Sequence, residues 1–237
     1  LVSCGDDEKQ EIYSLSFEKG YYERPLLGAK NIPVRGGNRD YTVTVQNTDV
    51  LSIDIDLSSP IDMGNLVVKP KQKGETTITV KDNVTNETVD LKIKIVDSYL
   101  NLKVAHPAQV PYTGGENLFF INNSDRDFYL FDEKMEKKEC TGNYQFLIKN
   151  STCYMILNFD KELNDKRTYE YNISNTSERM FTLIEILLGI DWNMKADLIN
   201  RSTRSASPVT MNAVDTETNI IQYFVAGSND IPENILD

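Results

Sequence analysis

The sequence has very few of the residues and motifs on which enzyme catalysis usually depends. It contains one histidine, His106, which precedes Pro107 and has no nucleophilic serine or cysteine pattern near it. A Gly-x-Ser-x-Gly turn, a His-Glu-x-x-His helix, a phosphate-binding loop and a dinucleotide-binding glycine motif are all missing. We therefore expect no enzymatic activity, no catalytic residues and no cofactor.

Patterns of metal ligands are also scarce. Asn123, Asp125 and Asp127 alternate like the first ligands of a calcium loop, which uses oxygen donors. The remaining positions do not fit, because Phe128 stands where the loop needs glycine and Lys134 stands where it needs a bidentate glutamate. We expect a polar hairpin end here and predict no metal site.

Long apolar runs and an excess of positive charge are lacking as well. The longest apolar cluster, 181–190, is interrupted by polar residues and is shorter than the roughly 20 residues of a membrane-spanning helix. Lysine and arginine total 25 against 36 acidic residues, which gives a net charge of -11. Charge of this sign repels phosphate backbones, so we expect no nucleic-acid partner.

Only three cysteines are present, and the first has informative neighbours. The chain opens LVSCGDDE, with Cys4 preceded by small and apolar residues. This opening resembles the lipobox of bacterial lipoproteins, which implies that Cys4 is lipidated and that residues 1–10 are a lipobox remnant and tether. The acids after Cys4 are similar to the surface-export signal of some Gram-negative lipoproteins, although a solvated tether would also be acidic. The resemblance implies a protein held by its lipid at the cell-surface side of the outer membrane.

The other two cysteines, Cys140 and Cys153, could form a disulfide in an oxidising compartment. A hairpin turning at Asn150 and Ser151 would place Cys153 opposite Ile148. Cys140 would then lie several strand positions away, beyond the Cα separation of about 7 Å that a disulfide allows. We predict free thiols.

Alternating apolar residues dominate the first part of the chain. Examples are Tyr41, Val43 and Val45, and the run 91–95, in which lysines separate three branched apolar residues. A period of two with β-branched residues predicts half-buried strands. Glycine, proline and asparagine clusters separate these runs, so we predict a β-sandwich over residues 11–97.

Three stretches of this region carry a family resemblance: NTDVLSIDI, GNLVVKPKQKGETTITVKD and ETVDLKIKIV. They resemble the bacterial Ig-like group 2 domain of invasin-type and intimin-type surface proteins. Gly74, Ile78, Thr79 and Val80 match the Gly-x-x-x-Ile-Thr-Val pattern of that family. The resemblance implies a spacer or a cell-surface binding module without an active site.

The composition changes near Asp97 and Ser98, where we place the start of a second domain, 98–237. Strands are predicted near 119–121, 128–131, 144–149, 154–159 and 168–173, with turns at 141–143, 150–151 and 164–167. Residues 177–188 fit either a helix or a strand, and 209–225 predicts two more strands. We therefore predict an antiparallel β domain, which is a meander, a sandwich or a small barrel and loosely resembles calycin-like domains.

Three aromatic residues, Tyr21, Tyr22 and Trp192, are expected in loops. Aromatic faces stack on sugars and anchor protein interfaces, so they are candidate ligand-binding residues, although such residues also cap cores. Asp54 and Asp56 share one strand face, where two solvated acids are common in an acidic protein.

The predictions combine into an all-β protein of two domains, attached to the membrane through Cys4. We expect a non-enzymatic cell-surface binding or adhesion protein whose ligand is a polysaccharide or a host protein. The alternative is a structural accessory subunit of an outer-membrane uptake or assembly complex.

Overall fold

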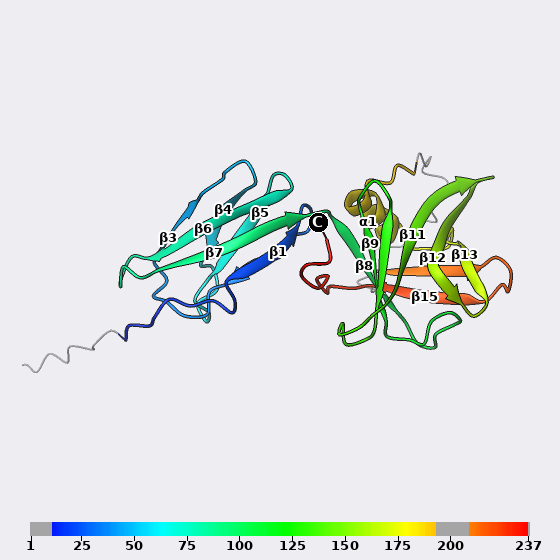
Figure 1. The fold of residues 1–237 in the computed structure, drawn as a ribbon, viewed down its shortest axis with the longest axis horizontal. Coiled ribbons are helices and arrows are strands. Elements are labelled where there is room, and N and C mark those ends of the chain that lie inside the picture. Colours follow the sequence, from blue (N-terminus) through cyan, green and yellow to red (C-terminus); the bar gives the residue numbers. More distant parts are fainter. Residues whose placement is uncertain (1–10, 193–208, 237) are drawn as a thin grey trace, which may run out of the picture. The chain divides into compact units, whose positions relative to one another are not determined.

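The computed structural model describes residues 11–192 and 209–236, and these residues are mostly in β-strands (Figure 1). The predicted all-β class is confirmed. The chain divides into two compact units between Val96 and Asp97, one residue before the position indicated by the sequence. Cys4 and its tether lie outside the described residues.

The first unit consists of two sheets (Figure 1). One sheet has the strand order β1-β7-β6-β3 and the other has the order β2-β5-β4. Strand β1 runs parallel to β7, whereas the other pairs are antiparallel. The strands are β1 (Tyr21–Pro25), β2 (Ile32–Pro33), β3 (Tyr41–Val45), β4 (Leu51–Asp56), β5 (Asn65–Pro70), β6 (Gly74–Asp82) and β7 (Thr88–Val96).

The alternating pattern forms the core of this unit. Leu91, Ile93 and Ile95 of β7 are buried, whereas Lys92 and Lys94 between them point away from the core. Successive side chains of a strand point to opposite faces, so one face of each sheet meets the other sheet. The sandwich predicted over 11–97 is confirmed.

Asp82 is a fully buried acid at the end of β6. Its Oδ2 accepts hydrogen bonds from the backbone and side-chain N–H groups of Asn38 at 2.8 and 2.9 Å, and its Oδ1 accepts from Val84 N–H at 2.9 Å. Burial raises the pKa of Asp82, but these hydrogen bonds and one from Thr85 outweigh it and leave the pKa below the ordinary value. The ionised form of Asp82 therefore stabilises this unit.

The second unit is a closed eight-stranded barrel with the order β10-β11-β12-β13-β14-β15-β8-β9. Among the described residues of this unit, one helix, α1 (Glu178–Leu188), interrupts the strands along the sequence (Figure 1). The strands are β8 (Tyr99–Val104), β9 (Asn117–Ile121), β10 (Asp127–Phe131), β11 (Lys138–Lys149), β12 (Thr152–Leu163), β13 (Lys166–Asn172), β14 (Thr210–Asp215) and β15 (Ile221–Ala226).

Aromatic side chains from alternate strand positions fill much of the barrel interior. Phe120 meets Tyr144 edge to face with ring centroids 5.0 Å apart, and Phe128 meets Phe159 at the same distance. Such edge-to-face pairs add stabilisation beyond the apolar area they bury. This part of the barrel is therefore a packed core rather than an open channel.

The turn predicted at 141–143 is wrong, because these residues lie within β11. Gly142 faces Phe128 of β10 on one side and Phe159 of β12 on the other. A Cβ at this position would lie 2.0 Å from the carbonyl oxygen of Asn158 and 2.7 Å from the ring of Phe128. The glycine is needed for close approach of neighbouring strands rather than for a turn.

The next predicted turn is confirmed. Asn150 and Ser151 connect β11 to β12 with φ of 51° and 61°, as expected for a two-residue hairpin turn. Cys153 then lies opposite Ile148, and both Cys140 and Cys153 are buried thiols without a disulfide. The register argument from the sequence is confirmed.

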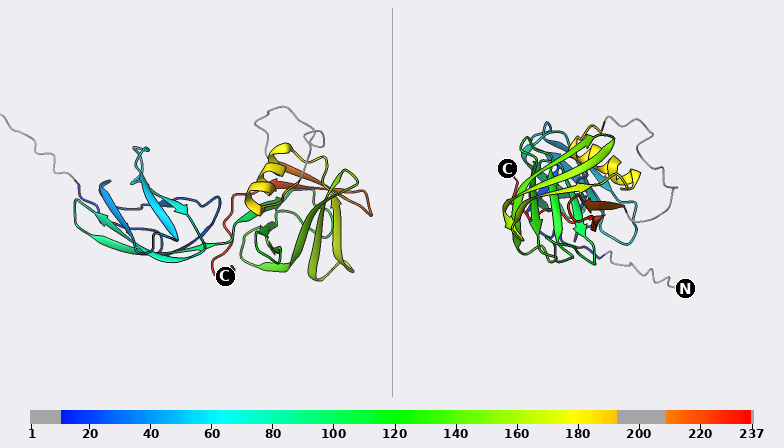
Figure 2. Two further views of the ribbon diagram at one scale, coloured as in Figure 1. Left: turned by 90° about the horizontal axis from the view of Figure 1, so that it is seen from above. Right: turned by 90° about the vertical axis from the view of Figure 1, so that its right-hand side faces the viewer.

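The ambiguous segment 177–188 folds as α1. Ser177 caps it, since its Oγ accepts the N–H of Met180 at 3.4 Å, and Gly189 ends it in the left-handed conformation. The buried face of the helix packs against the barrel core (Figure 2). Within residues 11–192 and 209–236, no helix is long and apolar enough to cross a membrane.

Trp192 follows α1 and helps to seal the same end of the barrel. Its ring lies 5.0 Å from that of Phe181 and 5.7 Å from that of Phe146, both edge to face. Arg126, in the turn between β9 and β10, donates a hydrogen bond to the carbonyl oxygen of Leu188 at 2.5 Å. These contacts hold α1 over this end of the barrel. The cavities of the barrel lie at the other end.

Candidate functional site

The opposite end of the barrel is covered by the long loop 105–116 between β8 and β9. Strand register brings the β10–β11, β12–β13 and β14–β15 connections to this end. The buried side chain of Gln222 holds the loop in place: its Oε1 accepts the N–H of Gln109 at 2.7 Å, and its Nε2 donates to the carbonyl of Ala105 at 3.3 Å. The loop is thus tied to β15.

Tyr112 extends from this loop into the mouth of the barrel. Its ring meets Phe224 edge to face at 5.5 Å, and its hydroxyl lies beside that of Tyr171 on β13. Neither hydroxyl makes a hydrogen bond of normal geometry with any described residue. Burial raises the pKa of both phenols above the ordinary value, so both are neutral.

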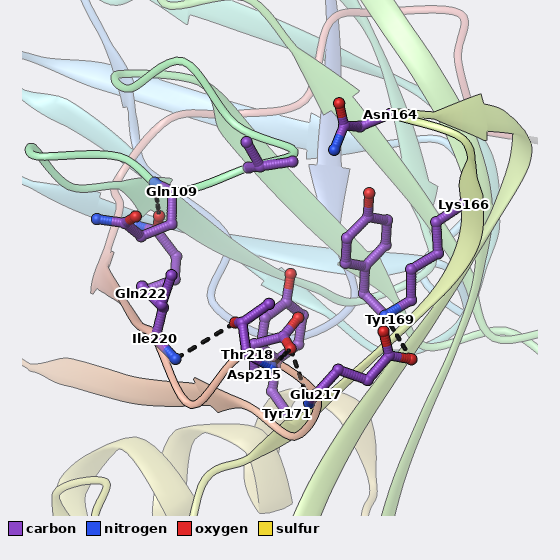
Figure 3. A pocket seen from close by; sticks show the side chains of 11 residues that line it. Gln109, Asn164, Lys166, Tyr169, Tyr171, Asp215, Glu217, Thr218, Ile220 and Gln222 are labelled. Atoms are coloured by element: carbon purple, nitrogen blue, oxygen red, sulfur yellow. Dashed lines mark hydrogen bonds and ion pairs between the residues drawn. The ribbon is translucent and has the colours of Figure 1, made fainter.

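The loop carrying Tyr112 separates two cavities. Gln109 and Val110 line the first, which has a volume of about 410 Å³ and is drawn in Figure 3. Thr113 and Gly114 line the second, of about 430 Å³. The loop therefore divides the barrel mouth into two separate cavities.

The first cavity places Tyr171 beside Asp215. The two residues are directly opposite in the antiparallel pairing of β13 and β14, so their side chains share one face of the sheet. Asp215 is 8% exposed, and its Oδ1 accepts the N–H groups of Glu217 and Thr218 at 2.9 Å each. These hydrogen bonds fix the β14–β15 turn, and both go to Oδ1, so Oδ2 of Asp215 takes no part in them.

The rim of this cavity carries an ion pair and apolar groups (Figure 3). Lys166 lies 2.9 Å from Glu217 and 4.8 Å from the centroid of the Tyr169 ring. Val110 and Ile220 are exposed on the rim. Apolar walls with a few convergent polar groups are typical of small-molecule sites.

The second cavity is mainly acidic. Glu116, Asp132, Glu133 and Glu139 line it together with Lys161. The carboxylate of Glu116 is already hydrogen-bonded within the loop, because it accepts the N–H groups of Thr113 and Gly114 at 2.5 and 2.6 Å. Burial raises the pKa of Glu116, but these hydrogen bonds outweigh it and leave the pKa below the ordinary value. Its role is to hold the loop.

The thiol of Cys140 also lines the second cavity. Burial raises the pKa of Cys140 to about 11, so the thiol is protonated at neutral pH. A protonated thiol is a weak nucleophile and a weak metal ligand. Cys140 therefore has the properties of a core residue.

The aromatic residues singled out from the sequence do not line either cavity. The loop position predicted for Tyr22 is wrong, because it lies in β1, whereas Trp192 lies outside helices and strands as predicted. Neither is at the surface, since Tyr22 is 3% exposed and Trp192 is 5% exposed. Tyr22 packs in the core of the first unit, and the ring of Trp192 packs against that of Phe181. Tyr21 is also in β1, half-buried rather than in a loop.

The acidic candidates have structural contacts. The Nδ2 of Asn123 donates to Asp127 at 2.6 Å, which closes the β9–β10 turn, and residues 11–192 and 209–236 contain no cluster suited to a metal ion. Asp54 pairs with Lys69, and Asp56 accepts the N–H of Ser58 at 2.9 Å. His106 is exposed in the covering loop.

Sequence reasoning did not identify Tyr112, Tyr171 or Asp215 as candidate site residues. Tyr171 was part of a predicted strand and Asp215 part of the segment 209–225, in which two strands were predicted, but no local motif marks either one. Tyr112 lies in a loop for which no structure was predicted. Only closure of the barrel brings the three together.

Comparisons with known proteins give little further information. No family model matches the chain. No curated protein matches it either. Solved structures with some likeness include two fragments of the S-layer protein SbsC. Domains 5-6 are 13% identical, with 67% of this chain and 89% of the other covered and a TM-score of 0.30. Domains 4-9 are 11% identical, with 91% and 31% covered and a TM-score of 0.31.

Likeness at these TM-scores carries no argument about the fold or role of this chain. The resemblance of residues 11–97 to Ig-like domains therefore stays a prediction.

Proposed function

We propose that this protein is a non-enzymatic binding protein, anchored to the cell surface through Cys4, whose first barrel cavity holds a saccharide unit. The observation that carries the proposal is the hydroxyl of Tyr171. It is in the cavity wall, it belongs to a residue that is 1% exposed, and it makes no hydrogen bond of normal geometry with any described residue, although the Tyr112 hydroxyl lies beside it. A buried polar group without a partner costs about 1–3 kcal/mol, which a ligand hydroxyl in the cavity would offset.

The mixed lining of the cavity supports a saccharide. A sugar ring has hydroxyl groups at its edge and apolar C–H faces, and the cavity offers both kinds of partner. Gln109, Asn164 and Thr218 supply polar side chains, whereas Val110 and Ile220 supply an apolar rim. The volume of about 410 Å³ is within the usual range of roughly 300–1,000 Å³ for small-molecule pockets.

A glycan array with the full chain tests the binding proposal. The chain would carry Cys4→Ala so that it can be handled without its lipid. We expect binding to a subset of glycans, and we expect Tyr171→Phe to weaken it. Tyr144→Phe is the matched control, because the Tyr144 hydroxyl bonds to the carbonyl of Ile121 and lies outside the cavity lining. Absence of binding to every glycan, or equal binding by both variants, would contradict the proposal.

The lipid anchor has its own test. In the native host, the Cys4→Ala form should leave the membrane fraction, because several acyl chains are needed to hold a protein on a bilayer. Mass spectrometry of the membrane-bound protein should show the acylated cysteine. An unmodified thiol at Cys4, or unchanged partitioning of the variant, would contradict the anchor.

One surface feature favours the alternative role as an accessory subunit of an outer-membrane complex. Ile221 and Tyr223 on the outer face of β15 are 39% and 41% exposed. Exposed apolar and aromatic residues next to one another are typical of protein interfaces. Co-purification of one defined envelope protein, lost in a Tyr223→Ala variant that retains glycan binding, would support this role.

A further inference from the structure

We infer that the ligand unit carries a protonated amine, which Asp215 and Tyr171 bind together on the wall of the first cavity. This inference rests on the proposed function and makes it more specific. It names the chemical class that the cavity selects, which is a primary ammonium rather than a neutral or acidic sugar.

The charge of Asp215 is the first reason. The residue is 8% exposed, and the part of the chain that the structure describes provides it with no ion pair. The lysine that lines the same cavity, Lys166, is paired with Glu217 at 2.9 Å. Buried carboxylates in proteins are normally paired with a cation, so an incoming cation would supply the missing charge.

The hydroxyl of Tyr171 is the second and independent reason. Strand register places Tyr171 opposite Asp215, and its hydroxyl is buried in the cavity wall, where it makes no hydrogen bond of normal geometry with any described residue, the neighbouring Tyr112 hydroxyl included. A phenol oxygen can accept hydrogen bonds, and an ammonium has three N–H donors. One ammonium can therefore donate to Oδ2 of Asp215 and to the oxygen of Tyr171 together.

The aromatic side chains around this position also suit a cation. The rings of Tyr169 and Tyr171 are nearly parallel, with centroids 6.4 Å apart. The ammonium of Lys166 already lies over the Tyr169 ring at 4.8 Å, so the cavity contains one cation–aromatic contact. A ligand ammonium beside Tyr171 would extend the same interaction.

The charge balance of the barrel mouth excludes acidic ligands. The first cavity has one lysine against Asp215 and Glu217, and the second has Lys161 against four carboxylates. The two cavities therefore have a net charge of 2 − 6 = −4 from these side chains. A barrel mouth with this net negative charge attracts cations and repels uronic acids, sulfated sugars and phosphates.

Calorimetric titration of the full Cys4→Ala chain tests the inference with four probes. Glucosamine carries the ammonium on a sugar, N-acetylglucosamine and glucose have the ring without the charge, and cadaverine has the ammonium without the ring. We expect glucosamine to bind about tenfold or more tightly than N-acetylglucosamine, since hydrogen bonds to charged groups are the stronger class. Strong binding of cadaverine would identify an alkylamine rather than an amino sugar as the source of the ammonium.

Two variants locate the effect. Asp215→Asn keeps an oxygen that accepts the turn N–H groups but removes the charge, and we expect it to weaken glucosamine binding about tenfold or more. Glu185→Gln is the matched control, because it removes one carboxylate from the exposed face of α1, outside both cavities. We expect it to change binding by less than about threefold, since α1 covers the other end of the barrel.

The outcomes separate this inference from the proposed function. Equal affinity for glucosamine and N-acetylglucosamine, or unchanged binding in Asp215→Asn, overturns the inference. Binding of neutral glycans that is sensitive to Tyr171→Phe would then leave the proposed function intact. Cadaverine binding that requires Asp215, with no glycan bound, would keep the ammonium site and overturn the saccharide proposal. No binding of any probe overturns the inference, and the additional absence of binding to every glycan on the array overturns the proposed function as well.

Discussion

Replacing a buried tyrosine of the barrel by phenylalanine is expected to change the free energy of unfolding in opposite directions at different positions. The hydroxyl of Tyr144 donates to the carbonyl oxygen of Ile121 at 2.8 Å, whereas the hydroxyls of Tyr112 and Tyr171 lie beside each other and make no hydrogen bond of normal geometry with any described residue. Replacing tyrosine by phenylalanine removes the hydroxyl and keeps the ring. The same chemical change therefore removes a satisfied group at one position and an unsatisfied group at the others.

The expected magnitudes follow from these contacts. A buried neutral hydrogen bond contributes about 0.5–1.5 kcal/mol net, so Tyr144→Phe should lower the free energy of unfolding by about 1 kcal/mol. An unsatisfied buried hydroxyl costs about 1–3 kcal/mol, so Tyr112→Phe and Tyr171→Phe should leave the free energy of unfolding unchanged or raise it by about 1 kcal/mol. Most single substitutions destabilise, which makes the predicted sign at Tyr112 and Tyr171 distinctive.

The assay is urea unfolding followed by tryptophan fluorescence. The chain has a single tryptophan, Trp192, which is packed in the barrel core, so its signal reports unfolding of the second unit alone. Linear extrapolation gives the free energy of unfolding for each variant. A loss of more than about 1 kcal/mol in Tyr112→Phe or Tyr171→Phe would show that the hydroxyl is satisfied in solution and would refute the reasoning.

Three further predictions concern other positions. Gly142→Ala should lower the barrel's free energy of unfolding by about 2 kcal/mol or more, because a Cβ would lie 2.0 Å from a backbone oxygen of the facing strand; an unchanged urea midpoint would contradict this. Despite burial, hydrogen bonds hold the pKa of Asp82 below its ordinary value of 3.8, so its ionised form stabilises the first unit above that pH and the effect is lost as pH falls through the lowered pKa. Acid unfolding followed by circular dichroism should lose this dependence in Asp82→Asn, and identical acid profiles would contradict it. In a Cys4→Ser chain, thiol titration in denaturant should count two thiols, from Cys140 and Cys153. In the native state these thiols should react slowly, because burial keeps them protonated. A count of zero would indicate a disulfide.

Several elements were predictable because their causes are local. The alternation in 91–95 buries one face of β7, and a period of two requires no knowledge of the partner strand. The turn at 150–151 fixes the register of its hairpin, which was enough to separate Cys140 from Cys153. These outcomes depend on neighbours a few residues apart.

Other elements were missed because their causes are distant in the sequence. Strand β8 lacks a clear alternation since both of its faces are covered: Leu100 and Leu102 face the barrel core, whereas Asn101 on the other face accepts the N–H of Asn229 near the C-terminus at 3.2 Å. Gly142 was interpreted as a turn residue because its real partner, the carbonyl of Asn158, belongs to the next strand. Local patterns carry no information on such contacts.

The sequence by itself determined the β-rich class and the acidic charge, since alternation and composition express these directly. It also determined that Cys140 and Cys153 form no disulfide with each other, since the hairpin turn at 150–151 sets their register. Only the tertiary structure decided where a ligand could bind. Tyr112, Tyr171 and Asp215 come from a loop and two strands, and they meet because the eight strands close on themselves and the loop folds over the open end. A site formed by closure of a barrel depends on pairings between distant segments, and the spacing of residues along the chain does not record those pairings.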